Sequence, residues 1–104
     1  MAEVAMKVIT YAGVAKSKYV EAIRAYKNKN IEMYDRLILE GDESFNEAHH
    51  SHFEILKEEI STGNPQISLL MAHAEDQLMN CETVKLLIVE ILGLLDTMKE
   101  DKNV

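Results

Sequence analysis

The 104-residue sequence lacks the elements of a sheet-rich, disulfide-bonded or membrane-spanning protein. One proline and four glycines provide few turn positions, and this composition favours a small number of long helices. A single cysteine, Cys81, excludes an internal disulfide, and its place on an apolar helical stripe predicts a buried thiol. The most apolar segment, residues 84–95, is interrupted by Lys85 and Glu90 and therefore cannot span a bilayer.

Charge and length narrow the function classes further. The formal net charge of -7 repels phosphodiester backbones and anionic headgroups, so no nucleic-acid partner is expected. Glu3 and Lys7 lie too close together to leave the apolar stretch of a signal peptide. We therefore expect one soluble, cytoplasmic domain over residues 1–104, with no direct insertion into a membrane.

Apolar residues recur at helical spacing in three segments, at about 2–27, 31–60 and 66–99. The intervening stretch at 61–66, STGNPQ, predicts a turn in which Asn64 caps the third helix and Pro65 is its first residue. In the second segment the apolar seam alternates by three and four residues, which predicts near-parallel, coiled-coil-like packing. That seam comprises Ile31, Tyr34, Ile38, Gly41, Phe45, Ala48, His52 and Ile55.

The third segment carries two adjacent stripes, whereas a helix in a small bundle needs only one. The first stripe comprises Ile67, Met71, Ala74, Leu78, Cys81, Ile88, Leu92 and Leu95. The second comprises Leu70, His73, Gln77, Asn80, Val84, Leu87, Ile91, Leu94 and Met98. Since one chain cannot cover both, we expect three-helix protomers to assemble into a homo-oligomer through this helix.

Four of the polar residues in the run LLMAHAEDQLMN at 69–80 recur at helical spacing: His73, Asp76, Gln77 and Asn80. Their spacing places them along one side of the helix. One interpretation is a buried polar network that fixes helix register. The other is chemical, because histidine is the side chain best suited to act as nucleophile, base or metal ligand at neutral pH. Motifs for nucleotide binding, metalloproteases, serine nucleophiles and thiol redox sites are absent.

The second segment adds the cluster EAHHSH at 47–52. His49 and His52 are three residues apart and are therefore a possible zinc-ligand pair, although a structural zinc site normally has four ligands. A zinc-binding bundle is thus an alternative that two ligands support only weakly.

Three segments together resemble the lactose/cellobiose-type IIA proteins of the phosphoenolpyruvate-dependent sugar phosphotransferase system. MAHAEDQLM at 71–79 is similar to that family's His-x-x-Asp-His-Leu-Met motif. YAGVAKSKYVEAI at 11–23 is similar to its Gly-x-Ala-(Arg/Lys)-Ser segment, and NEAHHSHFEIL at 46–56 to its Ala-His-x-x-Gln-Thr stretch. The order, spacing and length of the segments agree, so the resemblance covers nearly the whole chain.

The resemblance implies an all-α fold, an antiparallel three-helix bundle that assembles into a homotrimeric nine-helix bundle. His73 would accept a phosphoryl group from the phosphocarrier HPr and pass it to a cysteine of the IIB component, which serves the membrane IIC component. Asp76 would meet its two symmetry mates on the trimer axis around one shared Mg²⁺. The cargo would be a disaccharide of the lactose, cellobiose or chitobiose type.

The sequence departs from the family pattern around this site. Gln77 replaces the second histidine of the motif, His52 stands in place of glutamine, and Phe53 in place of threonine. As hydrogen-bond donors, Gln77, His49 and His52 are candidates for support of the phosphate. The departures leave an alternative open, a non-catalytic structural or regulatory helical trimer of the same fold. Asn80 has no assigned role.

Overall fold

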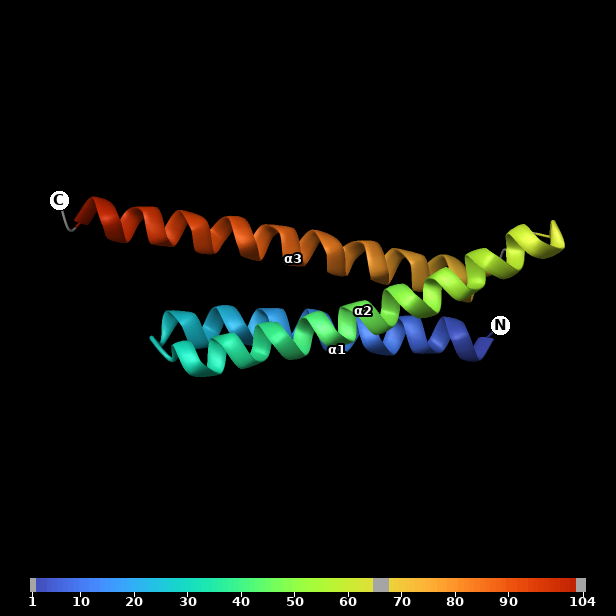
Figure 1. Cartoon of the computed structure of the whole chain (residues 1–104), viewed down its shortest axis with the longest axis horizontal. Helices are drawn as coiled ribbons and strands as arrows, with labels where there is room; N and C mark the ends of the chain where they lie inside the picture. Colours follow the sequence, from blue (N-terminus) through green and yellow to red (C-terminus); the bar gives the residue numbers. More distant parts are fainter. Residues whose placement is uncertain (1, 65–67, 103–104) are drawn as a thin grey trace.

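The computed structural model describes residues 2–64 and 68–102, which form three helices and no strand. α1 spans Ala2–Lys27, α2 spans Ile31–Thr62 and α3 spans Leu69–Lys102. The helices run up, down and up along a rod of 60 × 21 × 20 Å, so α1 and α3 are parallel and α2 is antiparallel to both (Figure 1). The all-α, three-helix fold predicted from the sequence is confirmed.

The connection between α1 and α2 is tight, and backbone hydrogen bonds close the last turn of α1. Lys29 has a φ of 62°, the left-handed conformation that commonly ends a helix. This places the Lys29 N–H 3.0 Å from the Tyr26 carbonyl oxygen and the Asn30 N–H 2.9 Å from that of Ala25. The Asn30 side chain then caps α2 by accepting a hydrogen bond from the Met33 N–H, at 3.2 Å.

α2 extends to Thr62, two residues beyond the predicted end at Ile60. It ends at Gly63, whose φ of 69° is the left-handed conformation that glycine adopts at low cost. The Gly63 N–H donates to the Glu59 carbonyl oxygen at 2.9 Å and so satisfies one of the last carbonyls of the helix.

α3 begins later than predicted, and its cap is a different residue. The Ser68 hydroxyl accepts a hydrogen bond from the Met71 N–H at 3.1 Å, so Ser68 occupies the capping position immediately before Leu69. The prediction that Asn64 caps this helix is wrong, because serine, also a strong capping residue, lies nearer the first helical turn. Pro65 lies outside the described residues.

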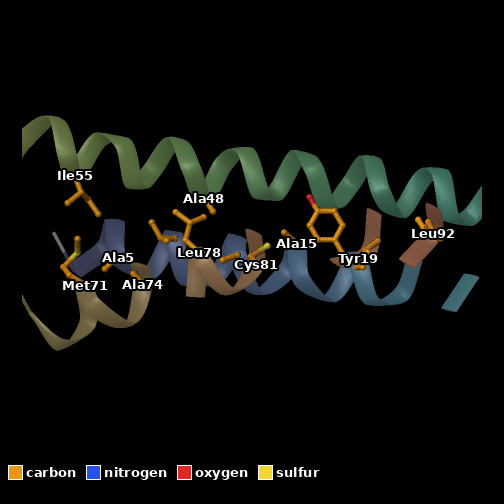
Figure 2. Packing of buried hydrophobic residues seen from close by; sticks show 13 residues of the cluster. Ala5, Ala15, Tyr19, Ala48, Ile55, Met71, Ala74, Leu78, Cys81 and Leu92 are labelled. Carbon is orange, nitrogen blue, oxygen red and sulfur yellow. The ribbon is translucent and has the colours of Figure 1, made fainter. Parts of the chain in front are cut away.

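α1 contacts both other helices extensively, whereas α2 and α3 touch each other much less. Its buried side is mostly alanine, which lets the neighbouring backbones approach closely. Figure 2 shows the core between the helices, with α1 and α3 supplying most of the labelled side chains. The core comprises Ala5, Val8, Ala12, Ala15, Tyr19, Ala48, Ile55, Met71, Ala74, Leu78, Cys81, Ile88 and Leu92.

At one junction, side chains from all three helices contact one another. The Tyr19 side chain of α1 is fully buried, and its hydroxyl donates to Asp42 Oδ1 of α2 at 2.6 Å. Burial is the main reason that the pKa of the Tyr19 phenol is raised well above its usual value. Lys85 Nζ of α3 lies 2.9 Å from the same Asp42 oxygen and 6.0 Å from the centroid of the Tyr19 ring. The backbone of α2 comes close to this ring at Gly41, where a Cβ would lie 2.7 Å from Tyr19 Cε1.

α3 presents two apolar faces, as the sequence predicts, and only one of them is covered within the chain. Every described member of the first stripe is buried or half-buried, including Cys81, whose thiol pKa is raised to about 11, chiefly by burial. Along the second stripe the side chains from position 87 onward are exposed. Their exposed fractions are Leu87 54%, Ile91 45%, Leu94 61% and Met98 50%.

Replacing Gly41 with alanine tests the Tyr19 junction. The added methyl group would collide with a ring that is fully buried and hydrogen-bonded to Asp42, so the ring has little room to move. We expect Gly41→Ala to lower the free energy of unfolding by about 1–3 kcal/mol in denaturant titrations. Gly93→Ala is the matched control, because nothing lies within 4 Å of a Cβ there. Equal stability of the two variants would contradict the described packing.

Candidate functional site

The polar residues of the run at 69–80 lie on α3 and point out of the three-helix core. His73, Asp76 and Asn80 are exposed, and Gln77 is half-buried. Neither His73 nor Asp76 has a hydrogen bond or ion pair with another described residue of the chain. Within one chain these residues therefore form no buried polar network, and the His73 imidazole is free to react.

Asp76 and Asn80 share a side of α3 with the exposed part of the second stripe. Positions 76, 80, 87 and 94 follow one another at spacings of four, seven and seven residues, and such positions line up along a helix. A neighbour that covers Leu87 and Leu94 would therefore also lie against Asp76. His73 lies on this same side, because positions 73, 80, 87 and 94 are each seven residues apart, and it precedes Gln77 by one turn.

His49 and His52 of α2 contact α3 on a different side from Asp76. His49 Nε2 lies 3.0 Å from Glu82 Oε1, and His52 Nε2 lies 3.3 Å from Glu75 Oε1. The two pairs frame a cavity of about 200 Å³ between α2 and α3. Its walls are His49, His52, Glu75, Leu78, Met79 and Glu82.

This arrangement separates the α2 histidines from His73. Successive residues of an α-helix are rotated by about 100°, so side chains two positions apart leave it in nearly opposite directions. Glu75 reaches His52 on α2, and His73, two positions earlier, therefore points away from α2. The structure does not bring His49 or His52 together with His73 within one chain.

The His–Glu pairs are polar bridges at the surface. The side chains of His49 and Glu82 are 53% and 48% exposed, and those of His52 and Glu75 are 18% and 50% exposed. Each pair is a full ion pair only when its histidine is protonated. Water screens charges at such exposure, so each pair stabilises the folded chain much less than a buried ion pair would.

The chemistry of the site favours His73 over Cys81 as the nucleophile. Cys81 is fully buried on the stripe of α3 that packs into the core, and its raised pKa keeps the thiol protonated at neutral pH. His73 is exposed, and an imidazole has a free nitrogen lone pair whenever it is neutral.

The described part of a single chain offers no ready metal site. Among residues 2–64 and 68–102, no group of three or more His, Cys, Asp or Glu side chains is arranged to hold a metal ion. The zinc interpretation of His49 and His52 therefore finds no third ligand there. Asp76 likewise stands as a lone carboxylate, so a cation bound at Asp76 would need ligands from other copies of the chain.

The contacts that Glu75 and Glu82 make with the α2 histidines were not predicted from the sequence. The two glutamates are seven residues apart on α3, and the histidines are three apart on α2. Spacings of three and seven residues each keep side chains on one side of a helix, so two facing His–Glu pairs were compatible with the sequence. The signal was hidden because sequence alone does not say which sides of α2 and α3 face each other.

A double-mutant cycle measures the strength of the bridges between α2 and α3. We expect His49→Ala and Glu82→Ala to show a coupling of about 0.2–1 kcal/mol in the free energy of unfolding, the range found for exposed ion pairs. The pair His50 and Glu54 is the control, since its atoms are 3.9 Å apart and both belong to α2. A coupling no larger than that of the control would show that the cross-helix pair is absent in solution.

The sequence matches the family described as "PTS system, Lactose/Cellobiose specific IIA subunit" over residues 3–96. It is 33% identical to the oligo-beta-mannoside-specific EIIA component of Bacillus subtilis, over 91% of this chain and 86% of that protein. It is 31% identical to the lichenan-specific phosphotransferase enzyme IIA component of the same organism, over 99% and 94% of the two chains. It is also 33% identical to the lactose-specific EIIA component of Lactococcus lactis, over 85% and 84%.

The fold agrees with a solved member of this group. The crystal structure of the cellobiose-specific enzyme IIA from Bacillus anthracis superposes with a TM-score of 0.82 at 32% identity, covering 94% of this chain and 90% of that one. No helix in the described part of this chain is long and apolar enough to cross a membrane. The chain belongs to the lactose/cellobiose-specific IIA family, whose members are transferase components of the sugar phosphotransferase system.

Proposed function

We propose that this chain is a cytoplasmic phosphocarrier in which His73 receives a phosphoryl group from HPr and passes it to a IIB component. The transfer supports phosphoenolpyruvate-dependent uptake, through the membrane IIC component, of a disaccharide of the lactose, cellobiose or chitobiose type. PTS IIA components in general pass phosphate between HPr and IIB. The observation that carries the proposal is the exposed His73, unbound by other described side chains, in the segment that resembles the family motif.

The proposed reaction is two successive phosphoryl transfers. A neutral nitrogen of His73 attacks the phosphorus of phosphorylated HPr, so a new P–N bond forms as the bond to HPr breaks. A thiolate of IIB then attacks the same phosphorus, and His73 leaves with the electron pair of its P–N bond. Such transfers need an in-line nucleophile and donors to the phosphate oxygens more than covalent help from the protein. An exposed imidazole suits the first requirement because both partners must reach it.

Gln77 is the nearest candidate donor to the phosphate, since it lies one turn from His73 on the same helix. Its side-chain amide donates hydrogen bonds but does not titrate. His49 and His52 are the weaker candidates, because each faces a glutamate across the α2–α3 cavity. Any help that they give to His73 would have to come from another copy of the chain.

The second apolar stripe of α3 supports the proposed homotrimer. Burying a leucine-sized side chain contributes roughly 1.5–3 kcal/mol, so the exposed residues from Leu87 to Met98 favour association. In a three-fold assembly through this face, three copies of Asp76 would converge and their charges would repel. One Mg²⁺ per trimer would neutralise them, and carboxylate oxygens are ligands that this ion accepts. The lone, exposed Asp76 fits such a shared site.

The phosphotransfer test uses the whole chain with phosphoenolpyruvate, enzyme I and HPr. We expect wild type to gain one acid-labile phosphate per chain, detected by mass spectrometry, and His73→Ala to gain none, because the attacking nitrogen is gone. His50→Ala is the control, as this exposed histidine lies on α2 outside the proposed site. Equal labelling of wild type and His73→Ala would refute the nucleophile, and no labelling of wild type would favour the non-catalytic trimer.

Chelation tests the role of Asp76. We expect excess EDTA to lower the melting temperature of wild type by several degrees, since unneutralised carboxylates would repel within the assembly. Asp76→Asn removes those charges, so its melting temperature should not respond to EDTA. Asp35→Asn, on the exposed surface of α2, should keep the wild-type response. A wild-type protein that is insensitive to EDTA would argue against a structural cation.

A further inference from the structure

A second cavity lies at the opposite end of the rod from His73. It measures about 500 Å³ and is formed where the end of α1 and the connection to α2 meet the C-terminal part of α3. Figure 1 shows these segments at the same end of the molecule. The walls of this lysine cavity are Tyr26, Lys27, Lys29, Leu95, Met98 and Lys99. With a rise of 1.5 Å per residue, it lies roughly 40 Å along α3 from His73.

The charge of the lysine cavity contrasts with that of the chain. The protein has a formal net charge of -7, yet among the lining residues that the structure describes three of six are lysines and none is acidic. No described carboxylate forms an ion pair with Lys27 or Lys29. Lys99 Nζ lies 5.6 Å from the centroid of the Tyr26 ring. The three ammonium groups therefore have their charge available to a ligand.

Lys29 provides an independent reason to look for a function here. Its φ of 62° makes it the one described residue other than glycine with a positive φ. Glycine occupies this helix-ending position at lower cost, because a Cβ is strained there. The lysine side chain lines the cavity, so the sequence places a cation at a position where glycine would give a more stable backbone. Strained residues of this kind gather at binding and catalytic sites.

The remaining residues that line the lysine cavity indicate that an anionic ligand would also have an apolar or planar portion. Tyr26, Leu95 and Met98 form an aromatic and aliphatic surface beside the lysines. The Tyr26 hydroxyl donates to Asp96, so the ring has its polar end satisfied and its position held. Binding sites for small molecules commonly combine such apolar walls with a few charged groups, in cavities of about 300–1,000 Å³.

We propose that the lysine cavity binds a phosphate-bearing small molecule with a planar or apolar portion, of the size of a nucleoside diphosphate. The ammonium groups of Lys27, Lys29 and Lys99 neutralise the phosphates, and Tyr26, Leu95 and Met98 contact the planar portion. Lysine is a common phosphate ligand that acts as a point charge. This site is separate from His73 and does not depend on phosphate transfer there.

Calorimetric titration of the full chain tests the site with ADP, inorganic pyrophosphate and adenosine as probes. We expect ADP to bind, pyrophosphate to bind more weakly because it lacks the planar portion, and adenosine not to bind. Raising the salt concentration should weaken ADP binding, since charge supplies much of the attraction. Lys99→Gln should weaken it at least tenfold. Lys57→Gln is the matched control, because Lys57 lies 5.9 Å from the Phe53 ring centroid in a similar cation–ring contact on α2.

Lys29→Gly is the decisive variant, because a folding defect cannot explain its expected result. Glycine relieves the backbone strain, so the melting temperature should rise while ADP binding falls at least tenfold. ADP binding that survives in both Lys29→Gly and Lys99→Gln would overturn the proposal. So would association with vesicles containing phosphatidylglycerol in the absence of ADP binding, since these lysines would then serve a lipid surface.

Discussion

The apolar surface of α3 is the constraint on which the rest of the structure depends. One face of this helix packs against the alanine-rich side of α1, and α2 completes the core with Ala48 and Ile55. The second face has no cover within the chain from Leu87 to Met98. Soluble monomers seldom leave a continuous apolar stripe in water, and such stripes usually mark an interface. The proposed association through α3 rests on this uncovered face.

The position of the candidate site follows from the same constraint. His73 and Asp76 lie at the N-terminal end of α3, on or beside the uncovered face, so they are exposed in one chain and near an interface in the proposed assembly. A lone carboxylate is costly to bury unless it is paired or holds a cation. The His73 side chain is exposed in the single chain, as a group that exchanges phosphate with other proteins must be. The proposed phosphocarrier thus uses one helix for folding, assembly and chemistry.

Much of the fold could be predicted from the sequence because helical periodicity records which side of each helix is apolar. That signal predicted the bounds of α1, the two stripes of α3 and the burial of Cys81. It did not predict the start of α3, because Asn64 and Ser68 are both good capping residues and their sequence does not say which one is used. It also did not predict the junction of Tyr19 with Asp42, which depends on how α1 and α2 face each other.

The candidate site likewise includes residues that a local motif identifies and contacts that only the folded chain brings together. The motif around His73 and Asp76 is local, so a resemblance at the level of sequence was enough to nominate both residues. The partners of His49 and His52 are glutamates 33 and 23 residues away, and only the folded arrangement of α2 and α3 pairs them. The lysine cavity likewise joins residues that lie far apart in the sequence, on either side of α2. No local pattern would have grouped Lys29 with Lys99.

The molar mass of the protein in solution tests the central claim most directly, that the second face of α3 is covered by other copies of the chain. Light scattering during size-exclusion chromatography, at low micromolar concentration with Mg²⁺ present, should give three times the chain mass of 11.8 kDa. A mass of 11.8 kDa under the same conditions would contradict the account, because the uncovered stripe would then be stable in water.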